Sequence, residues 1–268
     1  MASLRPLRAL ITNDDGIDSP GLWALAAAAR DAGLDVVVAA PHVDASGVGA
    51  SVLAVHESGH TVVLHPRKLP GLPGVLAYGV QGHPAFIVHA AGQGWLDPEP
   101  DLVLAGINVG ANVGRAILHS GTVGAALTAA LHGWWGLAVS LDTSREPPKR
   151  PHWESATHVF PRVLTVLLAA PKGTVLSLNV PDRAIAELGE LREARLARFG
   201  AMQVRVDQRT GAAGERLHAT FSDFAAPAEP GTDTALLAAG HPTVTELRSI
   251  EGRPGALEPR SVNARRPR

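Results

Sequence analysis

Short apolar runs alternate with helix-like segments over the first 180 residues of this chain. The runs expected to form buried strands are residues 8–12, 35–40, 101–105, 137–141 and 174–179, with 61–65 and 75–80 as further candidates. Helices are expected from Ser19-Pro20 to Gly33 and over residues 84–91, 121–132 and 154–170. Because repeated strand–helix–strand units place successive strands parallel, the pattern predicts an α/β fold whose mainly parallel sheet has helices on both faces.

The composition changes near Pro181. The remainder is richer in arginine and contains shorter alternating runs at 202–206 and 216–221, followed by one expected helix near 233–239. We therefore predict a core of residues 1–180 and a smaller strand-and-helix extension of residues 181–252. Residues 253–268, rich in proline and arginine, are predicted to be a disordered tail.

The bulk properties exclude several classes of protein. The chain has 268 residues, of which 46% are hydrophobic, which is enough for one large core. A net charge of −1 gives no indication of a nucleic-acid polymer or an anionic membrane as main partner. The absence of cysteine excludes disulfides, thiolate metal sites and cysteine nucleophiles. Without a signal-peptide pattern or an apolar run of about 18 residues, we expect a cytoplasmic protein.

Unusual polar residues follow three of the expected strands. Asn13, Asp14 and Asp15 follow the first, a glycine-rich segment at 42–49 follows the second, and residues 106–114 follow the strand at 101–105. Ligands of open parallel sheets bind beyond the carboxyl ends of the strands. Two adjacent carboxylates repel each other unless a cation neutralises them. With a serine hydroxyl and an asparagine carbonyl they form an oxygen cage suited to Mg²⁺ or Mn²⁺.

A fourth segment, Ser120-Gly121-Thr122, opens an expected helix. The free N–H groups of a helix N-terminus suit a phosphate, and a cation beside a phosphate is the usual apparatus of phosphoester chemistry. Of the 12 histidines, His119 is the best placed to donate a proton. Each segment also has a plain structural interpretation, since Asp-Asp-Gly is common in turns and serine or threonine often caps helices without any ligand. The argument therefore depends on all four segments falling at one end of the sheet.

These segments together resemble the SurE survival-protein family, the metal-dependent 5′/3′-nucleotidases. The matching stretches, in family order, are residues 11–17 with 19–22, 38–41 with 46–49, 100–108 with Gly110, Asn112 and Gly114, and 120–126 with 138–140. A weaker match lies at residues 232–233 and 244–245. The chain departs from the family at 82–88, where His83, Phe86 and Ile87 replace threonine, aspartate and cysteine, and at 245–247.

The resemblance implies a Rossmann-like three-layer core and a divalent metal. By motif position its ligands would be Asp14, Asp15, Ser46 and Asn108, the two aspartates being catalytic. Asn112 and the turn Ser120-Gly121-Thr122 would hold the substrate phosphate, and we expect Asn13 to contribute to substrate binding. The family also implies a homodimer or homotetramer in which an extended C-terminal segment is exchanged between subunits.

The expected activity is hydrolysis of nucleoside 5′- or 3′-monophosphates to nucleoside and phosphate, with the cation activating water. An aspartyl-phosphate mechanism is less favoured because both carboxylates are assigned to the cation. Two other functions stay open: a phosphatase specialised for a non-nucleotide metabolite, which the altered segment 83–88 suggests, and a non-catalytic nucleotide- or metal-binding module. A dehydrogenase is disfavoured, since no Gly-x-Gly-x-x-Gly follows the first strand.

Overall fold

The structure, a computed structural model, describes residues 5–52, 61–143, 150–198, 202–211, 214–223 and 229–248. The predicted tail at 253–268 lies outside these residues. Within the described ranges, every helix is too short or too polar to cross a lipid bilayer.

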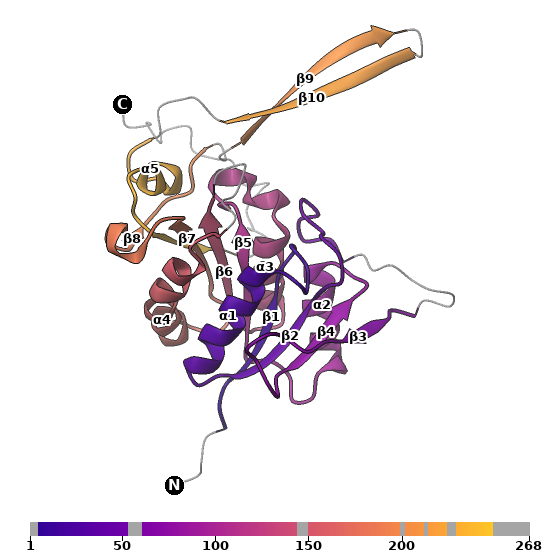
Figure 1. Ribbon diagram of the computed structural model, residues 1–268, viewed down its shortest axis with the longest axis vertical. Helices are drawn as coiled ribbons and strands as arrows, with labels where there is room; N and C mark the ends of the chain where they lie inside the picture. Colours follow the sequence, from indigo (N-terminus) through magenta and orange to yellow (C-terminus); the bar gives the residue numbers. More distant parts are fainter. Residues whose placement is uncertain are drawn as a thin grey trace, which may run out of the picture.

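The central sheet of the described chain has nine strands in the order β3-β4-β2-β1-β5-β6-β7-β11-β8 (Figure 1). The six strands from β4 to β7 run parallel, while β3 and β11 are antiparallel to β4 and β7. The predicted mainly parallel sheet is confirmed. Its strands are β1 (Arg8–Thr12), β2 (Asp35–Pro41), β3 (Leu64–Pro66), β4 (Leu76–Val80), β5 (Leu102–Val109), β6 (Trp135–Asp142), β7 (Val175–Pro181), β8 (Arg192–Glu193) and β11 (Thr243–Leu247).

Helices cover both faces of this sheet. Because side chains of a strand alternate between faces, β1 feeds two separate cores. Ile11 shares one buried cluster with Leu25 and Phe160, whereas Leu10 shares the other with Ile87. The first face carries α1 (Pro20–Asp31) and α4 (Trp153–Ala169), and the second carries α2 (Pro84–Ala90) and α3 (Gly121–Leu131). This is the expected three-layer arrangement.

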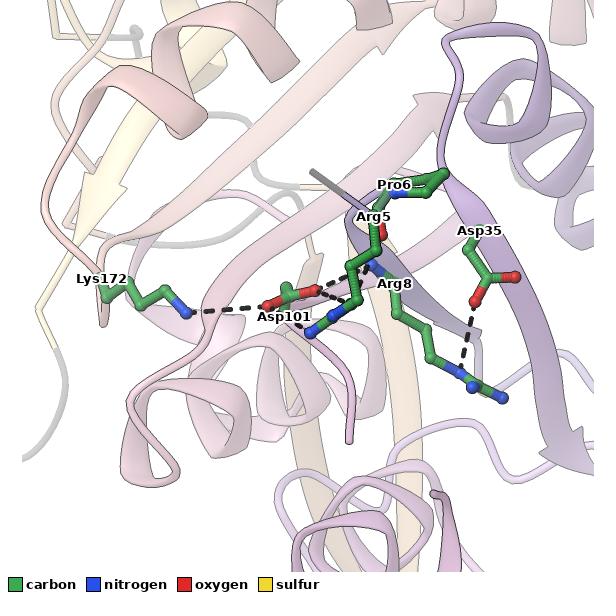
Figure 2. A network of polar contacts seen from close by, with 6 residues as sticks. All are labelled: Arg5, Pro6, Arg8, Asp35, Asp101 and Lys172. Atoms are coloured by element: carbon green, nitrogen blue, oxygen red, sulfur yellow. Dashed lines mark hydrogen bonds and ion pairs between the residues drawn. The ribbon is translucent and has the colours of Figure 1, made fainter. Parts of the chain in front are cut away.

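Charged side chains form hydrogen bonds and ion pairs at the amino-terminal ends of β1, β2 and β5 (Figure 2). The Asp101 carboxylate, just before β5, accepts hydrogen bonds from the Arg8 backbone N–H at 2.9 Å and from Arg5 Nη1 at 2.8 Å. Lys172 Nζ lies 3.8 Å from the same carboxylate, and Arg8 Nε lies 3.7 Å from Asp35. The acid at this edge is thus neutralised by cations of the chain itself.

The C-terminal region divides between the main sheet and a separate hairpin. Strands β9 (Met202–Gly211) and β10 (Gly214–Asp223) form an antiparallel two-stranded sheet that projects away from the body (Figure 1). The chain then forms α5 (Asp233–Ala238) and returns as β11, which pairs with β7. Part of the predicted extension at 181–252 therefore completes the core sheet, and the proposed domain boundary stays a prediction.

Several predicted boundaries were wrong by a few residues. The expected loop at 106–114 begins inside β5, which continues to Val109; the pairing of β5 with β6 slips between Ala105 and Asn108, so that Asn108 lies opposite Ser140. At this irregularity Gly106 has a φ of +135°, and an added Cβ would lie 2.2 Å from the Val139 carbonyl oxygen. Such a bulge interrupts the regular pairing without ending the strand, so β5 continues past the predicted end at residue 105.

The boundaries of three further elements also differ from the predicted ones. β3 occupies residues 64–66 instead of 61–65, and β6 begins at Trp135 instead of residue 137. The helix expected at 84–91 ends at Ala90 and continues as a π-helical turn, Ala91–Trp95. Two short 3₁₀ helices, Gly114–His119 (η2) and Ile185–Glu187 (η3), complete the elements.

Candidate active site

The order of the strands reverses direction between β1 and β5, which are neighbours in the sheet. From β1 the chain proceeds to β2 and β4 on one side and then crosses to β5 on the other side of β1. At such a reversal the connections leave in opposite directions, and ligands of open α/β sheets bind there. Asp14 and Asp15 leave β1 at this point, and Asn108 lies near the end of β5.

The Asp14 carboxylate is buried against the first turn of α3. Thr122 Oγ1 donates to Asp14 Oδ1 at 2.5 Å, and the Thr122 backbone N–H donates to Oδ2 at 3.3 Å. A Cβ on Gly121 would lie 2.7 Å from Asp14 Oδ2, so only glycine permits this approach. Burial raises the Asp14 pKa above its ordinary value although these hydrogen bonds act in the opposite direction.

Asp15 lies beside Asp14 and reaches toward β5. Its Oδ2 accepts a hydrogen bond from the Val109 backbone N–H at 3.3 Å. Burial, followed by repulsion from the Asp14 carboxylate, raises the pKa of Asp15 to about 7, with Asp44 adding to the repulsion. In the part of the chain that the structure describes, no Lys, Arg or His forms an ion pair with either acid. The pair therefore lacks the neutralisation that Asp101 receives.

The side-chain carbonyl of Asn108 faces the same place. Asn108 Nδ2 donates to the Gly110 carbonyl at 2.8 Å, which fixes the amide, and Asn108 Oδ1 lies 3.4 Å from Thr122 Oγ1. Since Thr122 also contacts Asp14, the structure brings together three of the predicted ligands, Asp14, Asp15 and Asn108.

Ser46 and His119 lie on adjoining segments instead of against the carboxylates. The loop after β2 is fixed by a 2.8 Å hydrogen bond from the Ala45 N–H to the Asp14 carbonyl, and Ser46 itself is exposed. His119, also exposed, ends η2. Within the described ranges, no hydrogen bond joins either side chain to Asp14 or Asp15.

The predicted phosphate-binding residues differ in how much of their hydrogen-bonding capacity is free. Asn13 is fully buried; its Oδ1 accepts from the Gly16 N–H at 3.1 Å, whereas its Nδ2 has no partner among the described residues. Asn112 Nδ2 donates to Ser140 Oγ at 2.9 Å. Ser120 Oγ caps α3 by accepting from the Val123 N–H at 3.1 Å. The anion that the structure shows at this helix N-terminus is the Asp14 carboxylate.

Comparison with known proteins places the chain in a family. The model of the family described as "Survival protein SurE" matches residues 9–205. The chain belongs to the SurE family. It is 35% identical to the 5′-nucleotidase SurE of Rhodopseudomonas palustris, with 90% of this chain and 93% of the relative covered, and 34% identical to that of Stenotrophomonas maltophilia, with 94% and 93% covered.

A solved structure agrees with this assignment. The crystal structure of the SurE protein from Aquifex aeolicus matches with a TM-score of 0.74 and 30% sequence identity, covering 92% of this chain and 95% of that one. The SurE fold therefore extends over nearly the whole chain, including parts of the region after residue 181.

Two residues that the sequence argument missed hold the segment 110–114 of this SurE protein. Asn179, on β7, accepts from the Asn112 N–H at 2.8 Å and donates to the Asn112 carbonyl at 2.9 Å. Asp233, at the start of α5, accepts from the Gly114 N–H at 2.7 Å and from the Ala197 N–H at 2.9 Å. A polar residue ending an apolar strand was a usable signal for Asn179. Asp233 lies within the weaker family match at residues 232–233, but no local pattern indicated its contact with Gly114, which comes from a remote segment.

The donors present fit a hard divalent cation. Burial raises the pKa of Asp14 and of Asp15, the Asp14 carboxylate raises that of Asp15 further, and an amide oxygen faces the same point; Mg²⁺ and Mn²⁺ favour such oxygen donors. Among the described residues there is no cluster of three or more His, Asp or Glu side chains that would suit a metal. The SurE site instead combines two carboxylates with neutral oxygens.

Proposed function

We propose that this SurE chain is a divalent-metal-dependent phosphomonoesterase that hydrolyses nucleoside 5′- or 3′-monophosphates to nucleoside and inorganic phosphate. The observation that carries the proposal is the pair Asp14 and Asp15, without cationic partners in the described structure, beside Asn108 at the switch point of the sheet. Membership of a family whose relatives are named 5′-nucleotidases supports the substrate class. Metal dependence is general among SurE nucleotidases.

Asp14, Asp15 and Asn108 would hold the cation, with Ser46 supplied by the adjoining loop. Mg²⁺ or Mn²⁺ is the proposed ion. When bound, it supplies positive charge to the phosphoryl oxygens and lowers the pKa of water. Thr122 keeps Asp14 in place by binding both carboxylate oxygens.

Other residues of the chain bind the ester and move protons. Asn13 is proposed to contribute to substrate binding; its Nδ2 is buried and has no partner among the described residues. Asn112, Ser120, Gly121 and Thr122 are proposed to bind the phosphate from the β5 and α3 side. His119, exposed at the end of η2, is the proposed donor of a proton to the departing ribose oxygen.

An aspartyl-phosphate intermediate is the less favoured mechanism. Asp14 Oδ1 and Oδ2 both accept hydrogen bonds from Thr122, which leaves this carboxylate poorly disposed to attack phosphorus. Isolation of a phosphorylated aspartate would reverse this choice.

A phosphatase for a non-nucleotide metabolite is the second candidate. His83, one of the residues that departs from the family pattern, lines a cavity beside the loop that contacts Asp14. A preference for aryl or sugar phosphates over every nucleotide would support this candidate. Nucleotide binding without turnover would support a non-catalytic module.

We also propose that the protein is a cytoplasmic homodimer or homotetramer. The β9–β10 hairpin projects from the body as a separate two-stranded sheet (Figure 1), and isolated two-stranded hairpins are at best marginally stable in water. A partner subunit would supply the missing packing. Light scattering coupled to size-exclusion chromatography would show a monomer if this proposal is wrong.

The decisive activity test is a panel of nucleoside monophosphates assayed with Mg²⁺, Mn²⁺ or EDTA. We expect phosphate release that requires the metal and that is lost in Asp14→Asn. Asp31→Asn, an exposed acid at the end of α1, is the matched control and should retain activity. Equal release in EDTA would contradict the proposal.

A further inference from the structure

The carboxyl end of β6 lies beside the segment 108–112, which carries two of the predicted site residues. Strand β6 is the neighbour of β5 in the sheet (Figure 1), and Leu141 on β6 lies opposite Val109 on β5. The Gly110 N–H donates to the Leu141 carbonyl at 2.9 Å. β6 ends one residue later, at Asp142. Since neighbouring strands are about 5 Å apart, this acid lies next to the candidate active site.

The side chain of Asp142 belongs to the face of β6 that contacts a predicted phosphate-binding residue. Asn112 Nδ2 donates to Ser140 Oγ at 2.9 Å. Side chains two residues apart on a strand point to the same face, and Asp142 is still paired with Pro181 of β7. Leu141, between the two, is buried in the core on the opposite face. The Asp142 carboxyl and the Asn112 amide therefore share one face of the sheet at its carboxyl edge.

The space next to this segment is open. A Cβ added to Gly110 would meet no atom of the described structure within 4 Å. Asp142 itself is partly exposed. A ligand whose phosphate lies at Asn108 and Asn112 can therefore extend past Gly110 to the end of β6.

The Asp142 carboxylate has acceptor capacity that the described residues leave unused. It accepts no hydrogen bond and forms no ion pair with any of them, whereas the neighbouring Asp182 carboxylate accepts from the His152 N–H at 2.8 Å. Burial raises the pKa of Asp142, with Arg183 acting against this shift and Asp182 adding to it. Hydroxyl groups of a ligand would donate to the charged carboxylate and stabilise it.

We propose that Asp142 binds the ribose of a nucleoside 5′-monophosphate, with its carboxylate accepting hydrogen bonds from the 2′- and 3′-hydroxyls. The inference rests on the proposed nucleotidase function and adds selectivity for the sugar to it. The two oxygens of a carboxylate can accept from both hydroxyls of a vicinal diol. In dinucleotide-binding α/β folds an acidic residue binds a ribose hydroxyl in this way.

A nucleotide without these hydroxyls would leave the partly buried Asp142 carboxylate without a donor. A site that hydrogen-bonds a substrate hydroxyl discriminates against the analogue that lacks it, because the group of the protein is then left unpaired. Ribonucleotides should therefore be preferred over dideoxynucleotides that carry the same base and phosphate.

AMP and 2′,3′-dideoxy-AMP test this inference in the full wild-type chain, because they differ only in the two hydroxyls. We expect kcat/KM for AMP to exceed that for the dideoxy nucleotide by about tenfold or more, the order expected for a hydrogen bond to a charged group. Equal values for the two nucleotides would overturn the ribose contact and leave the nucleotidase intact.

Variants assign the preference to one side chain. In Asp142→Ala the kcat/KM ratio of AMP to the dideoxy nucleotide should fall to within about threefold of unity, whereas a merely structural defect would lower both values in parallel and keep the ratio. Asp31→Ala, which removes an exposed acid at the end of α1, is the matched control and should keep the wild-type ratio. Asp142→Asn retains one acceptor oxygen and should give an intermediate ratio, which tests the inference even where the alanine variant does not fold.

Other outcomes separate this inference from the proposed function. A wild-type ratio in Asp142→Ala would overturn the ribose contact while nucleotide hydrolysis itself stays established. Metal-dependent hydrolysis of 4-nitrophenyl phosphate without hydrolysis of any nucleotide would overturn both.

Discussion

Replacing Asp15 by asparagine should stabilise the metal-free protein at neutral pH. The fold raises the pKa of this acid from 3.8 to about 7, and each unit corresponds to about 1.4 kcal/mol. The full shift amounts to about 4 kcal/mol as an upper limit. Because Asp15 is partly exposed, solvent screening reduces this value, and we expect a gain of about 1–3 kcal/mol in the free energy of unfolding.

The pH dependence has a definite sign. A carboxyl whose pKa is higher in the folded state holds its proton more tightly there, so the stability of the wild-type protein declines as pH rises from about 4 to about 7 and then levels off. Asp15→Asn lacks this titration. The stability difference between the two proteins should thus be smaller at pH 5, where about two fifths of the full effect is present, and largest at pH 8 when EDTA is present.

Denaturant unfolding at pH 5, 6, 7 and 8 measures both effects. Asp101→Asn is the matched control at the opposite edge of the sheet, where the Asp101 carboxylate is neutralised by Arg5, Lys172 and the Arg8 N–H; this variant should be destabilised by about 1–3 kcal/mol. Added Mg²⁺ should stabilise wild type and have little effect on Asp15→Asn. If Asp15→Asn in EDTA is destabilised as much as Asp101→Asn, the account of an unneutralised acid pair is wrong.

Three more changes test the site. Asp14→Asn should lower kcat/KM on nucleotides at least about a hundredfold by removing a metal ligand, and steady-state kinetics would show this. Thr122→Ala should weaken Mn²⁺ binding about tenfold, as titration calorimetry measures, while Thr122→Ser, which keeps the hydroxyl, should bind nearly as wild type. Asp233→Asn should raise KM several-fold through displacement of Gly114 yet leave Mn²⁺ affinity within about twofold; a parallel loss of Mn²⁺ affinity would refute that role.

The fold was predictable because local pattern and tertiary structure agree over the core. β1 spans the predicted residues 8–12, and α1 (Pro20–Asp31) lies within the helix expected from Ser19-Pro20 to Gly33. The bulge after Ala105 was not predictable, since nothing in a continuous apolar run shows where pairing slips by one residue. This is why Asn108 was expected in a loop and lies in a strand.

Two of the four predicted metal ligands, Asp14 and Asp15, could be identified from their position directly after an apolar strand. The other two, Ser46 and Asn108, were selected by the family resemblance. The contact between Asp14 and the N-terminus of α3 could not be predicted from the sequence. The sequence indicates that an anion is favoured at this helix N-terminus, but not that the Asp14 carboxylate, which follows β1, would occupy it. The hydrogen bond from the Gly114 N–H to Asp233 likewise joins segments that are distant in the sequence, so local patterns could not predict it.

The most direct test of the central claim measures two properties of the purified protein: Mn²⁺ binding, by electron paramagnetic resonance, and hydrolysis of AMP. We predict that the wild-type chain binds one Mn²⁺. Asp14→Asn should lose both the bound manganese and the hydrolysis, whereas Asp31→Asn should retain both. Manganese bound as tightly by Asp14→Asn as by the wild-type protein would contradict the assignment of this aspartate, and undiminished hydrolysis in excess EDTA would contradict the metal-dependent mechanism itself.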